Sequence, residues 1–379
     1  MDATIQKTIL FGIFIVIGFF LKRKFNSKAE IQGLKKIILN LALPATIFIA
    51  LMGIDIDPGL VGFPLMALGI NLLLFYIFPL ILLLVGFKKD SSDYRTMRLM
   101  IPSLAPGLSC FPFISEILGQ EYLAKAAMAD LGNKVFVLII LYSIATQWYF
   151  KQTSNNNNKK EKGKLKTLLI TLFSEPVTLL ILVALALMTF GFSFETLPAI
   201  AQDTIQKLSL LMTPLVMIFI GLAVKIRKDQ CIKLLSILII RAGVVMLISA
   251  GVIWVMQISV REDILWMLAF SLSACSFWPY AHIAGISEKE KKELGKEKTF
   301  KSSTAINLLA LSFPLSTLII MTVMLNPDFM MIPSHIVAVA VACLGIGSVL
   351  VIWIRLKEIK GMRSNSKAIR FKWMDYKKV

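Results

Sequence analysis

The chain is divided into eleven long apolar runs that are separated by short polar segments. Each run can cross a bilayer as a helix, because a helix rises about 1.5 Å per residue and the hydrocarbon core is about 30 Å thick. Apolar residues lie on all sides of most runs, whereas the strands of a membrane barrel would alternate apolar and polar residues. We therefore predict an all-α integral membrane protein with spans at 5–21, 34–53, 61–87, 99–118, 124–150, 167–190, 205–224, 234–257, 264–286, 303–325 and 335–354.

The composition places any function within or across the membrane. Of the 379 residues, 57% are hydrophobic and 17% are charged, compared with about 25% charged in soluble domains. The longest polar stretches are 151–166, 287–301 and the tail after Trp353. Each is shorter than the roughly 40 residues that an independently stable domain needs, so the chain has no room for a soluble catalytic domain.

The distribution of basic residues predicts the orientation of these spans. If the N-terminus lies outside, 35 of the 41 Lys and Arg fall on the cytoplasmic side and four on the outer side, while Lys134 and Arg241 lie within spans. Because positively charged loops stay in the cytoplasm, we expect a multi-pass protein of the plasma membrane, the inner membrane of a bacterium, with the C-terminus inside. The net charge of +18 then reflects topology, and we expect no nucleic-acid partner.

The two halves of the chain show matching patterns. Spans two and seven each contain one central proline, Pro44 and Pro214, while spans four and nine place Pro112 and Pro279 among small and aromatic residues. Each half holds five spans, so the second half enters the membrane from the opposite side, as in the inverted repeats of secondary transporters. We predict a first five-helix repeat at 1–150, a cytoplasmic linker at 151–166, a second, inverted five-helix repeat at 167–325, and an extra transmembrane helix with a basic cytoplasmic tail at 326–379.

Several short motifs resemble a known family of permeases. They occur in a fixed order along ten spans, over about residues 1–325, and the chain resembles the auxin efflux carrier family of the bile, arsenite and riboflavin transporter superfamily. The motifs are Gly18-Phe19-Phe20-Leu21-Lys22-Arg23-Lys24, Leu43-Pro44-Ala45, Pro106-Gly107 to Pro112, Leu118-Gly119, Asp130 with Asn133, Thr213-Pro214-Leu215 and Leu311-Ser312-Phe313-Pro314-Leu315.

This resemblance implies a fold and a kind of substrate. It implies ten core helices in two inverted five-helix repeats, with broken helices 4 and 9 crossing at the bilayer midplane, where anionic substrates bind. Members of the family carry auxin in plants and dicarboxylates such as malate or malonate in bacteria. The sequence departs from the family in two respects: residues 104–107 lack the asparagine that usually precedes the proline of helix four, and there is an eleventh span.

Span four is unusually rich in residues that break helices. It contains Pro102, Pro106 and Pro112, with a glycine and a serine between the last two. A proline removes a helical hydrogen bond, and in lipid such irregular backbone survives only where protein or a water-filled cavity covers it. We expect spans four and nine to be unwound near Pro112 and Pro279 and to form a binding site there; a plain kink is the alternative.

Span five carries the charged residues that are the best candidates for binding chemistry. Asp130, Asn133 and Lys134 stand at i, i+3 and i+4 and therefore share one face of a helix. A charge within a span is costly and usually faces the protein interior. Two interpretations stay open: Asp130 and Lys134 neutralise each other as a structural pair, or Lys134 holds an anionic substrate. Arg241 in span eight is expected to extend toward the inner membrane surface.

Together these features predict a secondary active transporter that moves a small organic anion, a carboxylate, by alternating access. The sequence has no catalytic constellation, P-loop or metal-ligand spacing, so we expect neither an enzyme nor a cofactor. The expected partners are the organic anion and membrane lipids, and a second copy of the chain is a further candidate. The predicted substrate-binding residues are Pro106, Ser109, Pro112, Asp130, Asn133, Lys134, Ser276, Trp278, Pro279 and Asn307.

Three other functions fit the sequence less well. A sodium-coupled carrier of the same superfamily needs acids and carbonyls around the ion, and only Asp130 and Glu116 are obvious candidates. An enzyme acting on lipids needs several acids or histidines within the membrane, and the chain has too few. A membrane sensor or scaffold that transports nothing is compatible with the pattern of spans.

Overall fold

The structure, a computed structural model, describes residues 3–25, 27–54, 58–153, 176–223, 231–290 and 298–375, and within these ranges it contains helices and no strand. Seven of the described helices are long and apolar enough to cross a membrane, and Ile9–Leu21 and Pro176–Thr189 are shorter apolar helices. Two further helical runs, over 92–118 and 261–290, are interrupted. Helix is therefore found in all eleven predicted spans, and the all-α multi-span class is confirmed. The inverted relation of the two halves stays a prediction.

Among the first five predicted spans, spans two, four and five are divided into several helical segments. Spans two, four and five include short π-helical stretches, labelled η, within or at the end of the helical run. The segments are α1 (Ala3–Leu21), α2 (Lys28–Ile37), η1 (Ile38–Ala42), α3 (Leu43–Met52), the 3-10 turn η2 (Pro58–Val61), α4 (Gly62–Leu84), α5 (Ser92–Met100), α6 (Pro106–Ser109), α7 (Phe111–Phe113), η3 (Ile114–Leu118), α8 (Gln120–Val135), η4 (Phe136–Ile140) and α9 (Leu141–Thr153).

The remaining spans follow after a stretch outside the described residues. That stretch, 154–175, includes most of the predicted linker 151–166 and the start of span six. The later segments are α11 (Pro176–Thr189), the 3-10 turn η6 (Phe194–Thr196), α12 (Ala199–Leu210), α13 (Met212–Ala223), α14 (Cys231–Val255), α15 (Arg261–Ser271), α16 (Phe277–Glu290), α17 (Ser302–Leu325), α18 (Pro327–Met330) and α19 (Pro333–Asp375).

Local sequence explains where several of these helices begin. Ser27 and Glu30 form a reciprocal capping box at the start of α2, with both hydrogen bonds at 3.1 Å. Ser91 caps α5 by accepting a hydrogen bond from the Tyr94 N–H at 3.2 Å. Pro44 lies in the first turn of α3, directly after the π-helical η1. A proline is tolerated there because the helix changes its hydrogen-bonding pattern at that point.

The two interrupted spans are unwound at residues 101–105 and 272–276. The break predicted near Pro279 lies directly before α16, which has Pro279 in its first turn, whereas the break predicted near Pro112 lies mainly at 101–105, and Pro112 itself lies in α7. Pro106 is a first-turn residue of α6. A proline suits the first turn of a helix, where its missing N–H is not needed. These prolines therefore mark where each helix resumes, and the unwound residues precede them.

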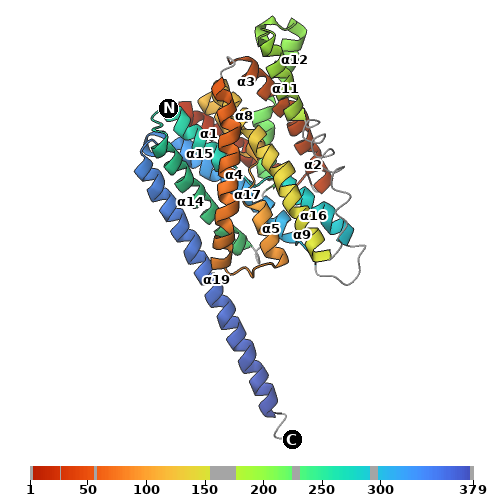
Figure 1. Ribbon diagram of the computed structural model, residues 1–379, viewed down its shortest axis with the longest axis vertical. Helices are drawn as coiled ribbons and strands as arrows, with labels where there is room; N and C mark the ends of the chain where they lie inside the picture. The colour runs from red at the N-terminus through yellow and green to blue at the C-terminus, as the bar shows by residue number, and fades with distance from the viewer. Residues whose placement is uncertain are drawn as a thin grey trace.

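Glycines allow α1 to pack closely on α13, and α8 on α4. A Cβ on Gly18 of α1 would lie 2.2 Å from the Ile218 carbonyl oxygen of α13, and one on Gly221 would lie 2.1 Å from the Ile15 oxygen. A Cβ on Gly132 of α8 would lie 1.9 Å from the Pro64 oxygen of α4. The long helix α19 packs along α14, and its C-terminal part extends beyond the other helices (Figure 1).

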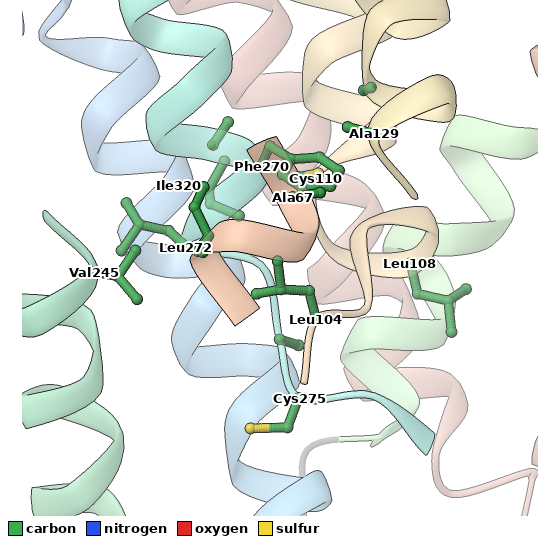
Figure 2. Packing of buried hydrophobic residues seen from close by; sticks show 14 of the residues in the cluster. Ala67, Leu104, Leu108, Cys110, Ala129, Val245, Phe270, Leu272, Cys275 and Ile320 are labelled. Carbon is green, nitrogen blue, oxygen red and sulfur yellow. The ribbon is translucent and has the colours of Figure 1, made fainter. Parts of the chain in front are cut away.

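Both interruptions are surrounded by a continuous apolar core. Leu104 and Leu272, one from each unwound segment, are at most 2% exposed. Figure 2 shows them with Cys110, Phe270 and Cys275 in the same cluster. Because water is excluded here, every polar group of the unwound backbone needs a partner within the protein.

Candidate functional site

The two unwound segments contact each other directly. The Ala105 N–H donates to the Ala274 carbonyl oxygen at 2.8 Å. The Ser276 N–H donates to Ser103 Oγ at 3.0 Å, and the Ala274 N–H donates to Ser109 Oγ at 3.0 Å. Backbone groups and serine hydroxyls thus join residues that lie more than 160 positions apart in the chain. We call this junction of residues 101–105 with 272–276 the crossing.

The Asn133 side chain forms hydrogen bonds with both the N–H and the carbonyl oxygen of Leu104. Its Nδ2 donates to the Leu104 carbonyl oxygen at 2.9 Å, and its Oδ1 accepts from the Leu104 N–H at 3.2 Å. The same amide donates to Asp130 Oδ1 at 2.8 Å and accepts from Asn71 Nδ2 at 3.1 Å. The Asn133 side chain is buried, so this amide replaces the hydrogen bonds that a continuous helix would have made.

Asp130 and Lys134 form the ion pair that their spacing predicts. Lys134 Nζ lies 3.5 Å from Asp130 Oδ2, and it also donates to Thr178 Oγ1 of α11 at 3.2 Å. Both charged residues are buried, with Lys134 only 4% exposed. The ammonium therefore lies next to the residue that clamps the crossing, and it links α8 to a helix of the second half.

Arg241 of α14 binds the crossing from the other side. Its Nε donates to the Ile101 carbonyl oxygen at 2.9 Å. Its Nη1 donates to the Ser273 carbonyl oxygen at 2.9 Å, and its Nη2 donates to the Ser103 carbonyl oxygen at 3.2 Å. The residue is 2% exposed. The expectation that Arg241 extends toward the membrane surface is wrong, because three freed carbonyls inside the protein offer the guanidinium better partners than the bilayer does.

The helix ends that meet at the crossing carry partial charges of opposite sign. Helices α5 and α15 end there, while α6 and α16 begin there. The C-terminus of a helix carries partial negative charge and its N-terminus partial positive charge. The Arg241 guanidinium lies at the carbonyls that follow α5 and α15, so the negative ends are compensated by a cation.

The other predicted site residues lie around the same junction. Ser109 and Ser276 make hydrogen bonds of the crossing itself, and the Trp278 N–H donates to Ser276 Oγ at 3.3 Å in the first turn of α16. Pro106, Pro112 and Pro279 are buried, Trp278 is partly buried, and Asn307 is half-buried on α17. Helix α17 packs against α6 and α15.

Two more polar contacts join helices near the site. His282 of α16 bonds through Nε2 to the Val137 carbonyl oxygen of η4 at 2.9 Å, and its ring lies 5.2 Å from that of Tyr142. Thr213 of α13 donates to Glu116 Oε1 of η3 at 3.1 Å. The first contact uses a backbone carbonyl of a π-helical segment as the acceptor, and the second uses a side-chain carboxylate.

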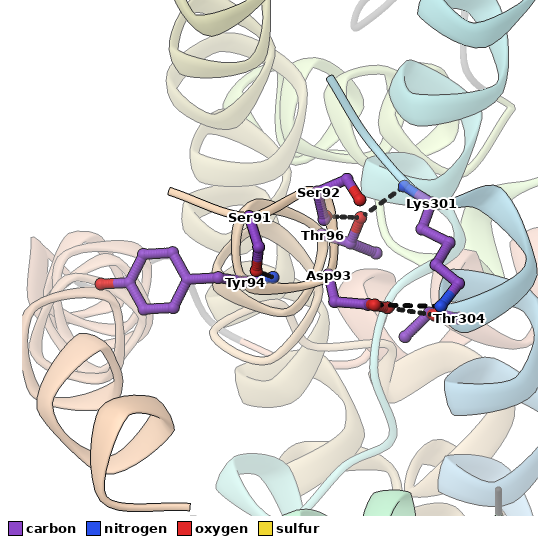
Figure 3. A network of polar contacts seen from close by, with 7 residues as sticks. All are labelled: Ser91, Ser92, Asp93, Tyr94, Thr96, Lys301 and Thr304. Carbon is purple, nitrogen blue, oxygen red and sulfur yellow. Dashed lines mark hydrogen bonds and ion pairs between the residues drawn. The ribbon is translucent and has the colours of Figure 1, made fainter. Parts of the chain in front are cut away.

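A polar network fixes the beginning of α5 against that of α17 (Figure 3). Asp93 accepts from Thr304 Oγ1 at 2.6 Å and from Lys301 Nζ at 3.0 Å. The Lys301 N–H donates to Thr96 Oγ1 at 2.9 Å. This network connects the half-helix that leads into the crossing to α17, which also packs on α6.

A cavity of about 820 Å³ lies where α4, α8 and α15 begin. Lys125 is among its lining residues, with Nζ 2.8 Å from Glu121 Oε1 and 3.8 Å from Asp263 Oδ1. Trp266, another lining residue, stands five positions before the end of α15. Within the described part of the chain, no group of three His, Cys, Asp or Glu side chains is placed to hold a metal ion.

The sequence did not reveal the roles of two residues at the site: Arg241 binds the crossing, and Asn71 binds Asn133. Arg241 was visible as a charge within a span, but its partners come from segments 140 and 32 positions away. Asn71 lies inside an apolar span, and its contact with Asn133 crosses 62 positions. An amide within a predicted span was the available signal for Asn71, since buried polar groups are rarely left without a partner.

Comparison with known proteins finds similarity to a transporter. Over 214 residues the chain is 24% identical to a protein of Methanocaldococcus jannaschii named "Uncharacterized transporter MJ1031". The match covers 56% of this chain and 66% of that relative, just under two thirds of the relative's length. No protein-family model matches the chain. Together with the multi-span helical fold, this similarity supports a membrane transporter in general terms.

Proposed function

We propose that the protein is a secondary active transporter of the auxin efflux carrier type that moves a small organic anion, a carboxylate, across the plasma membrane. The observation that carries this proposal is the crossing, where two interrupted helices meet inside the protein and the half-helix α16 begins. Discontinuous helices with half-helix N-termini directed at anionic groups are a recurring site design in secondary transporters.

Electrostatics favour an anion at this place. Arg241 compensates the carbonyls at the ends of α5 and α15, whereas the N-terminal ends of the next half-helices contribute positive potential. Lys134 adds a buried ammonium one residue beyond the clamp Asn133. In this proposal, Asn133 and Arg241 hold the geometry, and Lys134 attracts the carboxylate. The other predicted site residues, Pro106, Ser109, Pro112, Asp130, Ser276, Trp278, Pro279 and Asn307, shape the surroundings of the anion.

The packing of the helical segments that follow the two interruptions suggests how the site could open to one side of the membrane and then to the other. After the first interruption, α7 packs against α13 and η3 packs against α1. After the second, α16 packs against α5, α9, η4 and α17. The two half-helices thus face different neighbours apart from α17, which packs against α6 and α7 as well as against α16. In the proposed cycle, the inverted repeats exchange these environments, so that the site opens first to one side of the membrane and then to the other.

Ligand binding gives the first test of the proposed function. Purified protein is heated with organic acids such as malate, and in parallel with the uncharged amides of the same acids. A ligand at 100 times its dissociation constant adds about 2.7 kcal/mol of stability, so a transported acid raises the unfolding temperature and its amide does not. If no organic acid stabilises the protein more than its amide does, the anion site is wrong.

A double mutant separates the two roles of Lys134. If the Asp130–Lys134 pair is purely structural, Lys134→Met strands the carboxylate, and the double change Lys134→Met with Asp130→Asn restores both folding and transport. If Lys134 binds the substrate, the double mutant folds and reaches the membrane but loses transport and affinity for the anion. Transport and affinity are both normalised to folded protein, and near-normal values of both would assign Lys134 to structure.

A further inference from the structure

A small basic cavity lies where α19 meets the end of α4 and the beginning of α14. Its volume is about 100 Å³, several times the roughly 10–15 Å³ that one water molecule needs, so a group of a few heavy atoms such as a phosphate fits. Two of the described lining residues are cations, Lys233 and Arg355, and none of them is acidic. The other lining residues are Val85, Gly86, Val351 and Ile354.

The two cations are held by groups that carry no net charge. Lys233 Nζ lies 4.3 Å from the centroid of the Phe87 ring, and Arg355 Nη2 donates to the Leu84 carbonyl oxygen. A Cβ on Gly86 would lie 3.0 Å from Arg355 Nη2, so the glycine makes room for the guanidinium. Among the described residues, no carboxylate forms an ion pair with either cation. Two positive charges therefore line one cavity without an anion to compensate them.

The helix end beside Lys233 also favours negative charge. Lys233 is the third residue of α14. The N-terminus of a helix carries partial positive charge, so a cation there is unfavourable and an anion is favourable. Arg355, in contrast, binds a carbonyl at the C-terminal end of α4. An anion in the cavity would interact favourably with both cations and with the first turn of α14.

The surroundings of the cavity suit a lipid. The cavity lies at the ends of two candidate membrane spans, Gly59–Leu84 and Pro333–Lys357. Leu84, Ile352 and Trp353 are large apolar side chains near it that are exposed on the protein surface. The basic residues at this end predict that it faces the cytoplasm, where the leaflet carries anionic lipids. Basic pockets between transmembrane helices on that side are suited to anionic headgroups.

We propose that this cavity binds the phosphate of an anionic phospholipid of the cytoplasmic leaflet, with Lys233 and Arg355 as its two cationic partners. The acyl chains lie against the exposed apolar side chains of α4 and α19. The phosphate thereby joins α19, the helix outside the two predicted repeats, to α4 and α14. Inorganic phosphate offers the same charge without the chains, so it binds more weakly. The proposal does not depend on which substrate the protein transports.

Lipid binding is measured on the purified full-length protein in a nonionic detergent. Phosphatidylglycerol, zwitterionic phosphatidylcholine and inorganic phosphate are titrated while the unfolding temperature is recorded, and native mass spectrometry counts the lipid molecules retained. The variants are Lys233→Gln, Lys233→Arg, Arg355→Gln and the control Lys357→Gln. Lys357 is exposed on α19, two positions after Arg355, and is not a lining residue of the cavity.

The expected result is a preference for the anionic lipid that depends on both cations. Wild type retains one phosphatidylglycerol and is stabilised by it more than by phosphatidylcholine or inorganic phosphate. Losing a hydrogen bond to a charged group weakens binding about tenfold, so Lys233→Gln and Arg355→Gln each lose affinity for phosphatidylglycerol by about that factor. Lys233→Arg keeps most of the affinity, and Lys357→Gln equals the wild type. Each stabilisation is taken relative to the same variant without lipid, because Arg355→Gln also loses its bond to Leu84.

Three results would overturn the proposal. They are wild-type affinity for phosphatidylglycerol in Lys233→Gln, equal stabilisation by phosphatidylglycerol and phosphatidylcholine, and stabilisation by inorganic phosphate as strong as that by the lipid, which would make the cavity a site for free phosphate. If Arg355→Gln does not fold, the comparison of Lys233→Gln with Lys357→Gln decides. The transport of organic anions is measured separately, so failure of the lipid site leaves the proposed function intact.

Discussion

Asn133 is the residue on which the irregular backbone of the crossing depends most. One amide pairs with both the N–H and the carbonyl of Leu104, and it also bonds Asp130 and Asn71. In a site from which water is excluded, the two backbone groups of Leu104 would otherwise lie unsatisfied. The amide of Asn133 thus allows a helix to be interrupted in an apolar environment, and it holds the ion pair of Asp130 and Lys134 beside the interruption.

Removing this amide should destabilise the folded protein substantially. Asn133→Ala leaves the two backbone groups of Leu104 without partners, and burying an unsatisfied polar group costs about 1–3 kcal/mol each. We expect a clear drop in the unfolding temperature of the purified protein. Asn326→Ala is the matched control, because Asn326 is exposed and bonds only within its own helical turn. Equal unfolding temperatures for the two variants would contradict the role given to Asn133.

At the scale of elements, close helix contacts depend on glycine. Gly18 and Gly221 let the backbones of α1 and α13 approach so closely that a Cβ on Gly18 would lie 2.2 Å from the Ile218 oxygen. In membranes, where lipid tails are as apolar as side chains, such packing is a main source of helix association. The α1–α13 contact is therefore expected to stabilise the whole arrangement of spans.

Two alanine substitutions in α1 test this contact. Gly18→Ala must push the helices apart, and overpacking of this kind costs about 1–3 kcal/mol. Gly12→Ala, on the same helix, meets nothing within 4 Å, so it should leave the stability unchanged or raise it slightly through helix propensity. Thermal unfolding in detergent measures both variants. A Gly18→Ala protein as stable as Gly12→Ala would show that the two helices do not touch as described.

The sequence predicted the elements better than their interruptions. Apolar length alone indicated where helices form, because a bilayer demands about 20 apolar residues per helix: each predicted span contains described helix, and seven described helices are long and apolar enough to cross a membrane. Prolines indicated which spans would break, but Pro106 and Pro279 lie just after the unwound residues, since proline fits the first turn of a resuming helix. The pairing of Asn133 with Leu104 and of Arg241 with three carbonyls depends on tertiary proximity, which no local pattern contains.

At the scale of the whole molecule, the fold is consistent with the uneven distribution of charge. Helix α4 runs through the bundle of helices, and its C-terminal end lies on the side of the bundle from which α19 extends (Figure 1). Lys88 and Lys89 follow α4 in the chain, and Arg355, the first basic residue after Trp353, donates to the Leu84 carbonyl oxygen at the end of α4. The positive-inside rule therefore predicts that this end faces the cytoplasm.

Cysteine labelling tests this orientation. In a variant without the four native cysteines, Ser259→Cys follows α14 and Lys89→Cys follows α4, and both positions are exposed. An impermeant maleimide applied to intact cells should label Ser259→Cys, and it should reach Lys89→Cys only after the membrane is permeabilised. The reverse pattern would invert the topology, and labelling of both positions in intact cells would place these two turns on the same side.

Transport by the purified protein tests the central claim most directly. The protein is reconstituted into sealed lipid vesicles, and uptake of radiolabelled malate and of a panel of other organic acids is compared with uptake into vesicles without protein. The account predicts saturable uptake of at least one organic anion, competition by other anions but not by their amides, and loss of uptake in the folded Lys134→Met, Asp130→Asn double mutant. Uptake no greater than in protein-free vesicles, for every acid in the panel, would contradict it.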